Sequence, residues 1–324
     1  MDKFTNYFGI DISKDVFDVC DAQDHHHKFE NNLTGFKAFE KLMSKEDHLV
    51  MEATGSYHQQ FAQFFYKKGY AVSVINPLVI RRFIQMRLKH NKTDKADAAM
   101  IRQYARQEQP ELWRPKLAYR EECMELEGVI RLLLKQRTAL KNKLHSLLSK
   151  GSESKIAIQS IKSQILRLTK EVEKLEVEME EKVKQHDGEM LTLLTSIPGI
   201  GKKTALFLIV ITNGLENFSN SKQVSAYLGL APTERVSGSS VRGQSRISKS
   251  GNSTIRNLLF MCAFTACTHN KGCKQLYDRI VNKGKSKKLA LIAVTNKLLK
   301  QAFGIVKSGV PYDANFRSVR PIIA

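Results

Sequence analysis

The sequence has few cysteines and no long hydrophobic run. Its five cysteines, at positions 20, 123, 262, 267 and 273, are odd in number and contain no C-x-x-C pair. This usage favours reduced thiols that pack in the core of a cytosolic protein. The longest apolar run, Ala205 to Ile211, is far shorter than the roughly 20 residues of a membrane span, and the N-terminus lacks the pattern of a cleavable signal. We therefore expect a soluble globular protein without a membrane partner.

Acidic residues are scarce in the last part of the chain. From Leu191 to Ala324 there are 20 Lys and Arg against four Asp and Glu, so this segment carries 16 of the 20 net positive charges of the 324-residue chain. A compact basic region attracts polyanions, and nucleic acid is a commoner partner than a membrane surface when no lipidation signal is present. The sequence therefore predicts nucleic-acid binding by the C-terminal part.

Four carboxylates in the first third of the chain are candidate metal ligands: Asp11, Glu52, Asp94 and Asp97. Asp11 interrupts a short apolar run, where an unpartnered charge is costly, and Glu52 ends another apolar run just before a turn. Asp94 and Asp97 are three residues apart in a helix-forming segment, so they project from one face. A set of oxygen ligands without His or Cys favours Mg2+ or Mn2+ over zinc. Two such ions can clamp the attacking and leaving oxygens of a phosphodiester.

The element order around these acids predicts a fold. Strands are expected at 7–12, 15–21 and about 27–32, followed by a helix at 34–45, a strand at 48–52, a helix at 57–68, a strand at 70–75 and helices on either side of the Asp94 pair. This is the order of an RNase H-like α/β domain. Alternation of strands and helices alone would indicate only an α/β class.

Less specific interpretations remain open for several of these residues. Asp94 is also a plausible N-cap, and Asp97 a first-turn acid favoured by the helix dipole. The run His25 to His27 suggests a metal site, but consecutive side chains converge poorly on one ion, so a hairpin turn or an edge strand is favoured. A basic stretch precedes Asp94: Arg81, Arg82, Arg87, Lys89, His90 and Lys92. It is expected either to position phosphates or to form a solvated helix face.

Two heptad-like arrays follow. The first runs through positions 123, 126, 130, 133, 137, 140, 144 and 147, where every residue except Arg137 is apolar, and the second through 158, 161, 165, 168, 172, 175 and 179. A turn-like segment, 149–154, separates them. The arrays predict long coiled-coil helices, arranged either as an antiparallel hairpin or as pairs between protomers. So narrow a seam needs a partner, and we expect a homo-oligomer.

Two motifs in the basic part are candidates for phosphate contact. Pro198-Gly-Ile-Gly201 between helical segments resembles a helix-hairpin-helix, in which Gly199 and Gly201 admit a phosphate to backbone N-H groups and Lys202 and Lys203 flank it. The apolar-poor segment 235–251 carries the remaining candidates: Arg235, Arg242, Arg246 and Lys249. A plain interhelical turn and a flexible phosphate-binding loop are the simpler interpretations.

The order of motifs along nearly the whole chain resembles one known family. GIDISKDVFDV, MEATGSY, VINP, NKTDKADAAMI, SIPGIGKKTA, YLGLAPTERVSGSSVRGQSRISKSGN and KSGVPYD are similar to the motifs of the bridge-RNA-guided insertion-sequence recombinases. These are DEDD transposases related to the Piv-type invertases. The resemblance implies a RuvC-like N-terminal domain in residues 1–115, a coiled-coil region in 116–188 and a mostly helical, basic transposase domain in 189–324.

The same resemblance assigns roles to residues. It implies that Asp11, Glu52, Asp94 and Asp97 hold Mg2+ at the scissile phosphate. Ser237, with Ser239 and Ser240 as close neighbours, matches the nucleophile that links covalently to DNA. It further implies a structured bridge RNA that pairs with donor and target DNA, a dimer or tetramer, and action in the bacterial or archaeal cytoplasm at the nucleoid.

Two other functions compete with recombination. A RuvC-type structure-specific nuclease would use the four acids and water and would form no protein-DNA adduct. A non-enzymatic nucleic-acid scaffold would use only the basic half and the coiled coil, and its binding would not respond to Mg2+. The scaffold gives no reason for an acid within a buried strand.

Overall fold

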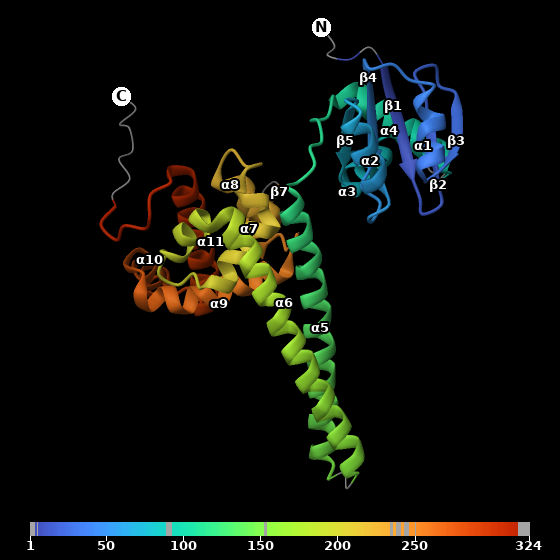
Figure 1. Cartoon of the computed structure of the whole chain (residues 1–324). Coiled ribbons are helices and arrows are strands. Elements are labelled where there is room, and N and C mark those ends of the chain that lie inside the picture. Colours follow the sequence, from blue (N-terminus) through green and yellow to red (C-terminus); the bar gives the residue numbers. More distant parts are fainter. Residues whose placement is uncertain are drawn as a thin grey trace, which may run out of the picture. The chain divides into compact units, whose positions relative to one another are not determined.

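The computed structural model describes residues 4, 6–88, 93–151, 154–233, 236–237, 241–242, 246–249 and 251–316. The chain forms two compact units, Met1–Pro115 and Lys116–Ala324. The first unit is mixed α/β and is built on one sheet, and the second is mostly helical (Figure 1).

The sheet of the first unit has the strand order β3-β2-β1-β4-β5. β1, β2 and β3 are antiparallel neighbours, whereas β4 and β5 run parallel to β1. In chain order the strands are β1 (Asn6–Ile12), β2 (Val16–Cys20), β3 (His26–Glu30), β4 (Asp47–Glu52) and β5 (Ala71–Ile75). The expected sequence of three strands, helix, strand, helix and strand is thus present.

Helices cover both faces of this sheet. Phe8, Ile10 and Ile12 of β1 share a core with residues of α1 and α2, while Tyr7, on the other face, packs with residues of α3 and α4. This division follows from strand geometry, because alternate side chains point to opposite faces. The four helices are α1 (Leu33–Glu40), α2 (His58–Lys67), α3 (Pro77–Met86) and α4 (Asp94–Glu108).

α1 is shorter than the expected helix at 34–45. It ends at Glu40, and the following N-H groups of Leu42 and Met43 bond to carbonyls only three residues back, at Phe39 and Glu40. The Asp47 side chain then accepts a hydrogen bond from Ser44 N at 2.7 Å, which fixes the turn into β4. Asp and Ser favour such local bonds over continuing a helix, so the sequence overstated the helix by about one turn.

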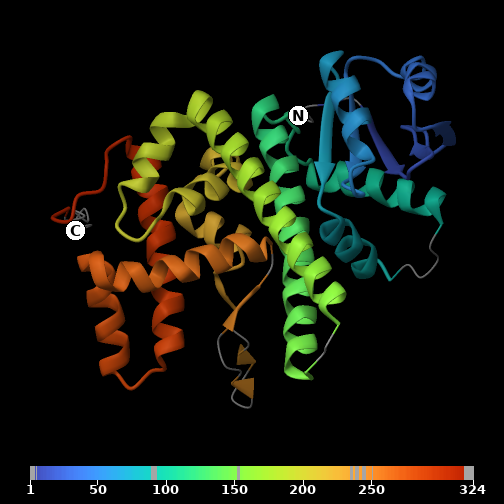
Figure 2. The ribbon, with the colours of Figure 1, turned by 60° about the horizontal axis from the view of Figure 1, so that its bottom comes forward.

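The second unit begins with a long antiparallel helical hairpin. α5 (Ala118–Ser149) and α6 (Lys155–Thr195) lie side by side in Figures 1 and 2. Cys123 and Ile130 on α5 and Val172 and Met179 on α6 are buried along the seam. Arg137, the polar position of the first array, donates a hydrogen bond from Nη1 to Thr169 Oγ1 across the seam at 3.3 Å. The two arrays therefore pair with each other within one chain, as the hairpin alternative predicts.

A buried arginine ties the base of this hairpin to the rest of the unit. Arg120 is 2% exposed, and its Nη2 lies 2.9 Å from Asp187 Oδ1 while its Nη1 lies 2.7 Å from Glu216 Oε1. Asp187 is the point at which the backbone of α6 leaves helical geometry, with φ −127° and ψ 30°. The guanidinium thus joins α5, the bend of α6 and the segment after α7.

α7 lies in the core of the second unit. This helix is buried from Thr204 to Thr212 and contacts α5, α6 and α9. The other elements are η1 (Asn213–Leu215), α8 (Ser221–Tyr227), α9 (Ser253–His269), α10 (Lys271–Asn282) and α11 (Lys287–Ser308). α7 itself spans Lys202–Thr212.

α11 is the one helix of the described residues that is long and apolar enough to cross a membrane by length and composition. The sequence did not indicate this, because lysines and polar residues interrupt the apolar residues of α11. Its Val294, Leu298 and Leu299 are buried in the core of the second unit, which explains the composition without a membrane. All five cysteines are free thiols, and four of them are buried, in agreement with a packing role.

Candidate active site

Strand register brings Asp11 and Glu52 to the same place on the sheet. Ile10 and Met51 are partners in the parallel β1–β4 pair. The residues that follow them, Asp11 and Glu52, therefore lie side by side on the two strands. Residues in register point to the same face. That face is the one covered by α4, because Val50, two residues before Glu52, packs against residues of α4.

α4 supplies the other two acids. The Thr93 hydroxyl accepts a hydrogen bond from Ala96 N at 3.2 Å and caps the helix, so Asp94 and Asp97 both lie in its first turn. Thr93, not Asp94, is therefore the N-cap. The helix approaches β1 at Gly9, where an added Cβ would lie 2.2 Å from the carbonyl oxygen of Ala98. Only glycine allows so close a packing of helix on strand.

The electrostatics of Asp11 respond to the other three acids. Burial, followed by the negative charges of Asp97, Glu52 and Asp94 in that order, raises the pKa of Asp11 to about 6. Asp11 is half-buried, rather than enclosed as its position in an apolar strand suggests, because it lies one residue from the end of β1. A bound cation would stabilise the ionised form of a half-buried carboxylate that lies among like charges.

Among the described side chains, no group of three or more His, Cys, Asp or Glu converges closely enough to hold a metal ion. The donor chemistry nevertheless fits a hard cation, because the acids around Asp11 offer only oxygen ligands and their mutual repulsion is already visible in its pKa. A cation bound near Asp11 would relieve the repulsion from Asp97, Glu52 and Asp94.

A fifth acid, Asp18, lies beside Asp11 and was not predicted from the sequence. It is the direct partner of Asp11 in the antiparallel β1–β2 ladder and is 4% exposed. Its charge also raises the pKa of Asp11. His26 Nε2 lies 2.7 Å from Asp18 Oδ1. The alternation of Asp11 and Asp18 with apolar residues was visible in the sequence, but only the register of the hairpin makes them neighbours.

The histidine run belongs to an edge strand, as favoured above. β3 is the outermost strand of the sheet, and His26 and His27 bond to different acids: His27 Nε2 lies 2.8 Å from Asp21 Oδ2. His25 Nδ1 also lies 3.5 Å from Asp21 Oδ2. Successive strand residues point to opposite faces, so His26 is directed away from His27 and the three histidines do not converge on one ion.

Of the predicted basic stretch, Arg81 and Arg82 are exposed on α3 and Arg87 Nη2 donates to Gln107 Oε1 at 2.5 Å. Lys89, His90 and Lys92 lie outside the described residues.

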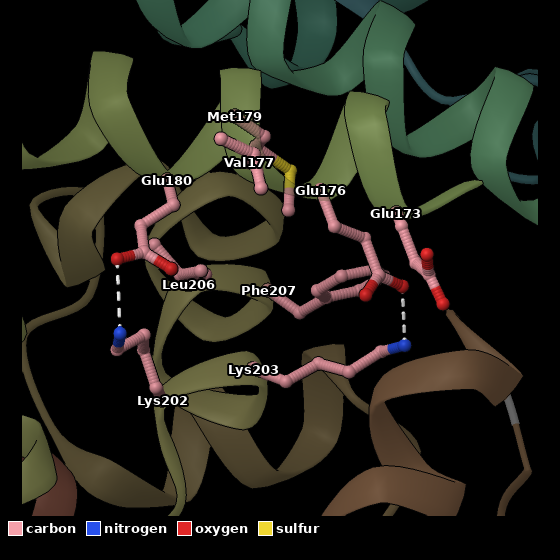
Figure 3. Close-up of a pocket in the computed structure, with 9 residues that line it drawn as sticks. All are labelled: Glu173, Glu176, Val177, Met179, Glu180, Lys202, Lys203, Leu206 and Phe207. Atoms are coloured by element: carbon pink, nitrogen blue, oxygen red, sulfur yellow. Dashed lines mark hydrogen bonds and ion pairs between the residues drawn. The ribbon is translucent and has the colours of Figure 1, made fainter. Parts of the chain in front are cut away.

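The predicted helix-hairpin-helix lies between α6 and α7. Gly199 has φ +108°, and an added Cβ would lie 2.7 Å from Ala266 Cβ on α9, so this glycine is required by packing. Gly201 caps α7 and faces open space. Lys202 and Lys203, at the start of α7, form ion pairs with Glu180 and Glu176 of α6. Figure 3 shows both pairs.

The predicted serine-containing segment carries short strand pairs. β6 (Pro232–Thr233) pairs with β9 (Arg246–Ile247), and β7 (Val236–Ser237) pairs with β8 (Val241–Arg242). Ser237 is the register partner of Val241, and Arg242 that of Val236. Arg246 and Lys249 are exposed. Arg235, Ser239 and Ser240 lie outside the described residues.

Comparison with known proteins identifies the family of the chain. Residues 8–152 match the DEDD transposase model of IS110 elements, and residues 191–278 match the transposase IS116/IS110/IS902 family. The pilin gene-inverting proteins of Moraxella lacunata and Moraxella bovis are each 31% identical over 320 residues, covering 95% of this chain and 97% of theirs. The transposase for insertion sequence element IS1111A of Coxiella burnetii is 25% identical over 323 residues, covering 89% of this chain and 86% of its own.

These matches extend over both structural units. The DEDD model begins at β1 and includes the strands and helix that carry Asp11, Glu52, Asp94 and Asp97. The second model spans the Pro198–Gly201 turn and the segment that contains Ser237. The chain belongs to the IS110/IS116 family of DEDD transposases, which are enzymes that act on DNA.

Proposed function

We propose that this transposase cuts and rejoins DNA through a covalent bond between Ser237 and a DNA phosphate, at a site where the carboxylate cluster holds Mg2+. The observation that carries the proposal is the environment of Asp11, whose pKa is raised by burial and then by Asp97, Glu52 and Asp94. Three separate segments of the chain supply these charges. A fold that needed them only for stability would gain nothing from placing like charges together.

The first unit is, in this proposal, an RNase H-like domain of the RuvC type. What supports it is the strand order β3-β2-β1-β4-β5 with three antiparallel strands followed by two parallel ones. The acids lie on the central strand, on its parallel neighbour and on the helix that covers both. We assign residues 1–115 to this domain, 116–188 to the coiled coil and 189–324 to the transposase domain with the serine.

Asp11, Glu52, Asp94 and Asp97 are the residues that would hold Mg2+, with Mn2+ as an alternative ion. When bound, the ion supplies charge neutralisation at the scissile phosphate. The chain's own contribution is to keep the carboxylates together: the ladder fixes Asp11 beside Glu52, and the cap at Thr93 fixes the first turn of α4.

The covalent step conserves the phosphoester bond. The Ser237 hydroxyl oxygen attacks the scissile phosphorus, one P-O bond to deoxyribose breaks, and the serine proton ends on the departing deoxyribose oxygen. The enzyme-DNA bond therefore retains the energy needed for rejoining, and no ATP is consumed. Arg235, Arg242, Arg246 and Lys249 would contact the phosphates around this serine.

The partners in this proposal are donor and target DNA, a structured bridge RNA and further copies of the chain in a dimer or tetramer. Support for the nucleic acids is the +16 charge of residues 191–324 and family membership. A guide that reads sequence by base pairing leaves the protein to bind backbones. The enzyme would act at the nucleoid, in the cytoplasm of a bacterium or archaeon.

The test is detection of a covalent protein-DNA adduct on a denaturing gel. The full chain is incubated with RNA transcribed from the flanks of its element, cognate DNA and Mg2+. We expect an adduct with the wild type and with Ser239→Ala, and none with Ser237→Ala or Glu52→Gln. DNA cleavage without adduct that survives Ser237→Ala would instead identify a hydrolytic nuclease. Binding that ignores Mg2+, with no cleavage, would identify a scaffold.

A further inference from the structure

The two lysines at the start of α7 are already occupied by carboxylates. Lys202 Nζ lies 3.0 Å from Glu180 Oε1, and Lys203 Nζ contacts Glu176 Oε1. Both glutamates come from α6, the helix that precedes the hairpin turn, and Figure 3 shows the two pairs closing opposite sides of one hollow. The groups that the sequence predicts to contact DNA phosphates are therefore engaged with acids of the same chain.

The spacing of these acids matches that of the lysines. Glu176 and Glu180 are four residues apart, so they lie on one face of α6, about 6 Å apart along its axis. They meet consecutive lysines in the first turn of α7, where the helix dipole also favours negative charge. A nucleic-acid backbone would offer the same lysines the same kind of acceptor, which is an anionic oxygen.

We propose that Glu176 and Glu180 act as an intramolecular substitute for phosphate: they hold Lys202 and Lys203 in the nucleic-acid-free protein and are displaced when a DNA backbone binds at the hairpin. This inference rests on the proposed recombination of DNA and on the phosphate contact that the sequence predicts for the Pro198–Gly201 turn, and it adds an autoinhibitory contact to that site. We call Glu176 and Glu180 the latch glutamates.

The structure leaves room for this exchange. The hollow between the two ion pairs has a volume of about 440 Å3 and is lined by Val177, Met179, Leu206 and Phe207 between the charged residues. The side chains of Glu176 and Glu180 are 28% and 20% exposed, so water can hydrate a displaced carboxylate. Glu180 also pairs with Lys184, one turn further along α6, so it keeps a cationic partner after Lys202 leaves.

The latch is weak enough for DNA to open it. The side chains of Lys202 and Lys203 are 57% and 46% exposed, and exposed ion pairs contribute little because water screens them. Together the two pairs are expected to weaken DNA binding by about threefold to tenfold. Such a penalty disfavours single, non-specific phosphate contacts but is overcome when many contacts form at once.

The experiment measures the affinity of the full chain for a short fluorescein-labelled DNA duplex of arbitrary sequence by fluorescence anisotropy, at fixed salt. The test variant is Glu176→Gln with Glu180→Gln. The matched control is Glu171→Gln with Glu181→Gln, which removes the same charge from the same helix at exposed positions that neither line the hollow nor pair with either lysine. Circular dichroism checks that all variants fold.

We expect the test variant to bind DNA about threefold to tenfold more tightly than the control variant. In a protein that already carries Lys202→Ala and Lys203→Ala, the two glutamate substitutions are expected to give no gain in affinity. Equal affinities of the test and control variants for DNA would mean that the change in net charge alone explains the tighter binding, and this would overturn the inference. A gain that survives the lysine substitutions would overturn it as well, because the latch acts only through them.

Failure of the proposed recombination is distinguishable from failure of this inference. The adduct assay reports on Ser237 and the carboxylate cluster, whereas anisotropy reports only on equilibrium binding. A chain that forms no adduct but shows the latch effect would retain the inference and lose the covalent mechanism.

Discussion

Removing the charge of Asp11 is expected to stabilise the first unit, in a pH-dependent way. The folded-state pKa of Asp11 is about 6, above its ordinary value of 3.8. Between these two values the folded chain holds a proton on Asp11 that the unfolded chain has lost, so stability falls as the pH rises. The loss is complete once the pH exceeds the folded pKa.

The size of this effect follows from the shift. About two pKa units correspond to about 3 kcal/mol at 1.36 kcal/mol per unit, and partial exposure of Asp11 reduces the figure to about 2 kcal/mol through solvent screening. Asp11→Asn cannot ionise. We therefore expect the variant to be about 2 kcal/mol more stable than the wild type at pH 8, with the difference vanishing near pH 4.

The chain's single tryptophan makes the assay specific to the first unit. Trp113 donates its backbone N-H to Val72 O at 2.7 Å, and its ring stacks edge-on with Tyr66 at 5.7 Å. Urea unfolding followed by Trp113 fluorescence, with a chelator present, gives the stability of this unit at each pH. The control is Asp15→Asn, an exposed aspartate in the next turn.

An Asp11→Asn protein that is less stable than the wild type at pH 8 would refute the reasoning. It would mean that Asp11 makes a stabilising contact as an anion and that the neighbouring acids do not repel it. An equal gain from Asp15→Asn would show that net charge, and not the cluster, is responsible.

Two further predictions concern the second unit, whose unfolding can be followed by far-UV circular dichroism. Gly199→Ala should lower the free energy of unfolding by about 2–4 kcal/mol, because the residue has φ +108° and an added Cβ meets Ala266. Gly201→Ala should lower it by less than about 1 kcal/mol. Similar losses at both positions would contradict the packing role of Gly199. Arg120→Met should lower the free energy of unfolding by about 3–5 kcal/mol, because it leaves the half-buried carboxylate of Asp187 without its cationic partner. Lys135→Met on the exposed face of α5 should change it by less than about 0.5 kcal/mol.

Local pattern was sufficient for the elements and for which residues share a face. The short apolar runs in 7–12 and 48–52 predicted the strands of Asp11 and Glu52, and the spacing of Asp94 and Asp97 placed them on one helical turn, as the structure has them. The 3-4 spacing of apolar residues predicted both long helices. These features depend on residues close in sequence, whose side-chain directions the backbone fixes.

Features that depend on register or on distant partners were decided only by the tertiary structure. Asp18 became a neighbour of Asp11 through the β1–β2 register, and pairing within the chain, rather than between protomers, joined α5 to α6. Lys202 and Lys203, which the sequence presents as available cations, face Glu180 and Glu176. The sequence by itself determined which elements form and which charges they carry, because these follow from local geometry. The tertiary structure decided which charges meet, because that depends on how elements far apart in the chain pack together.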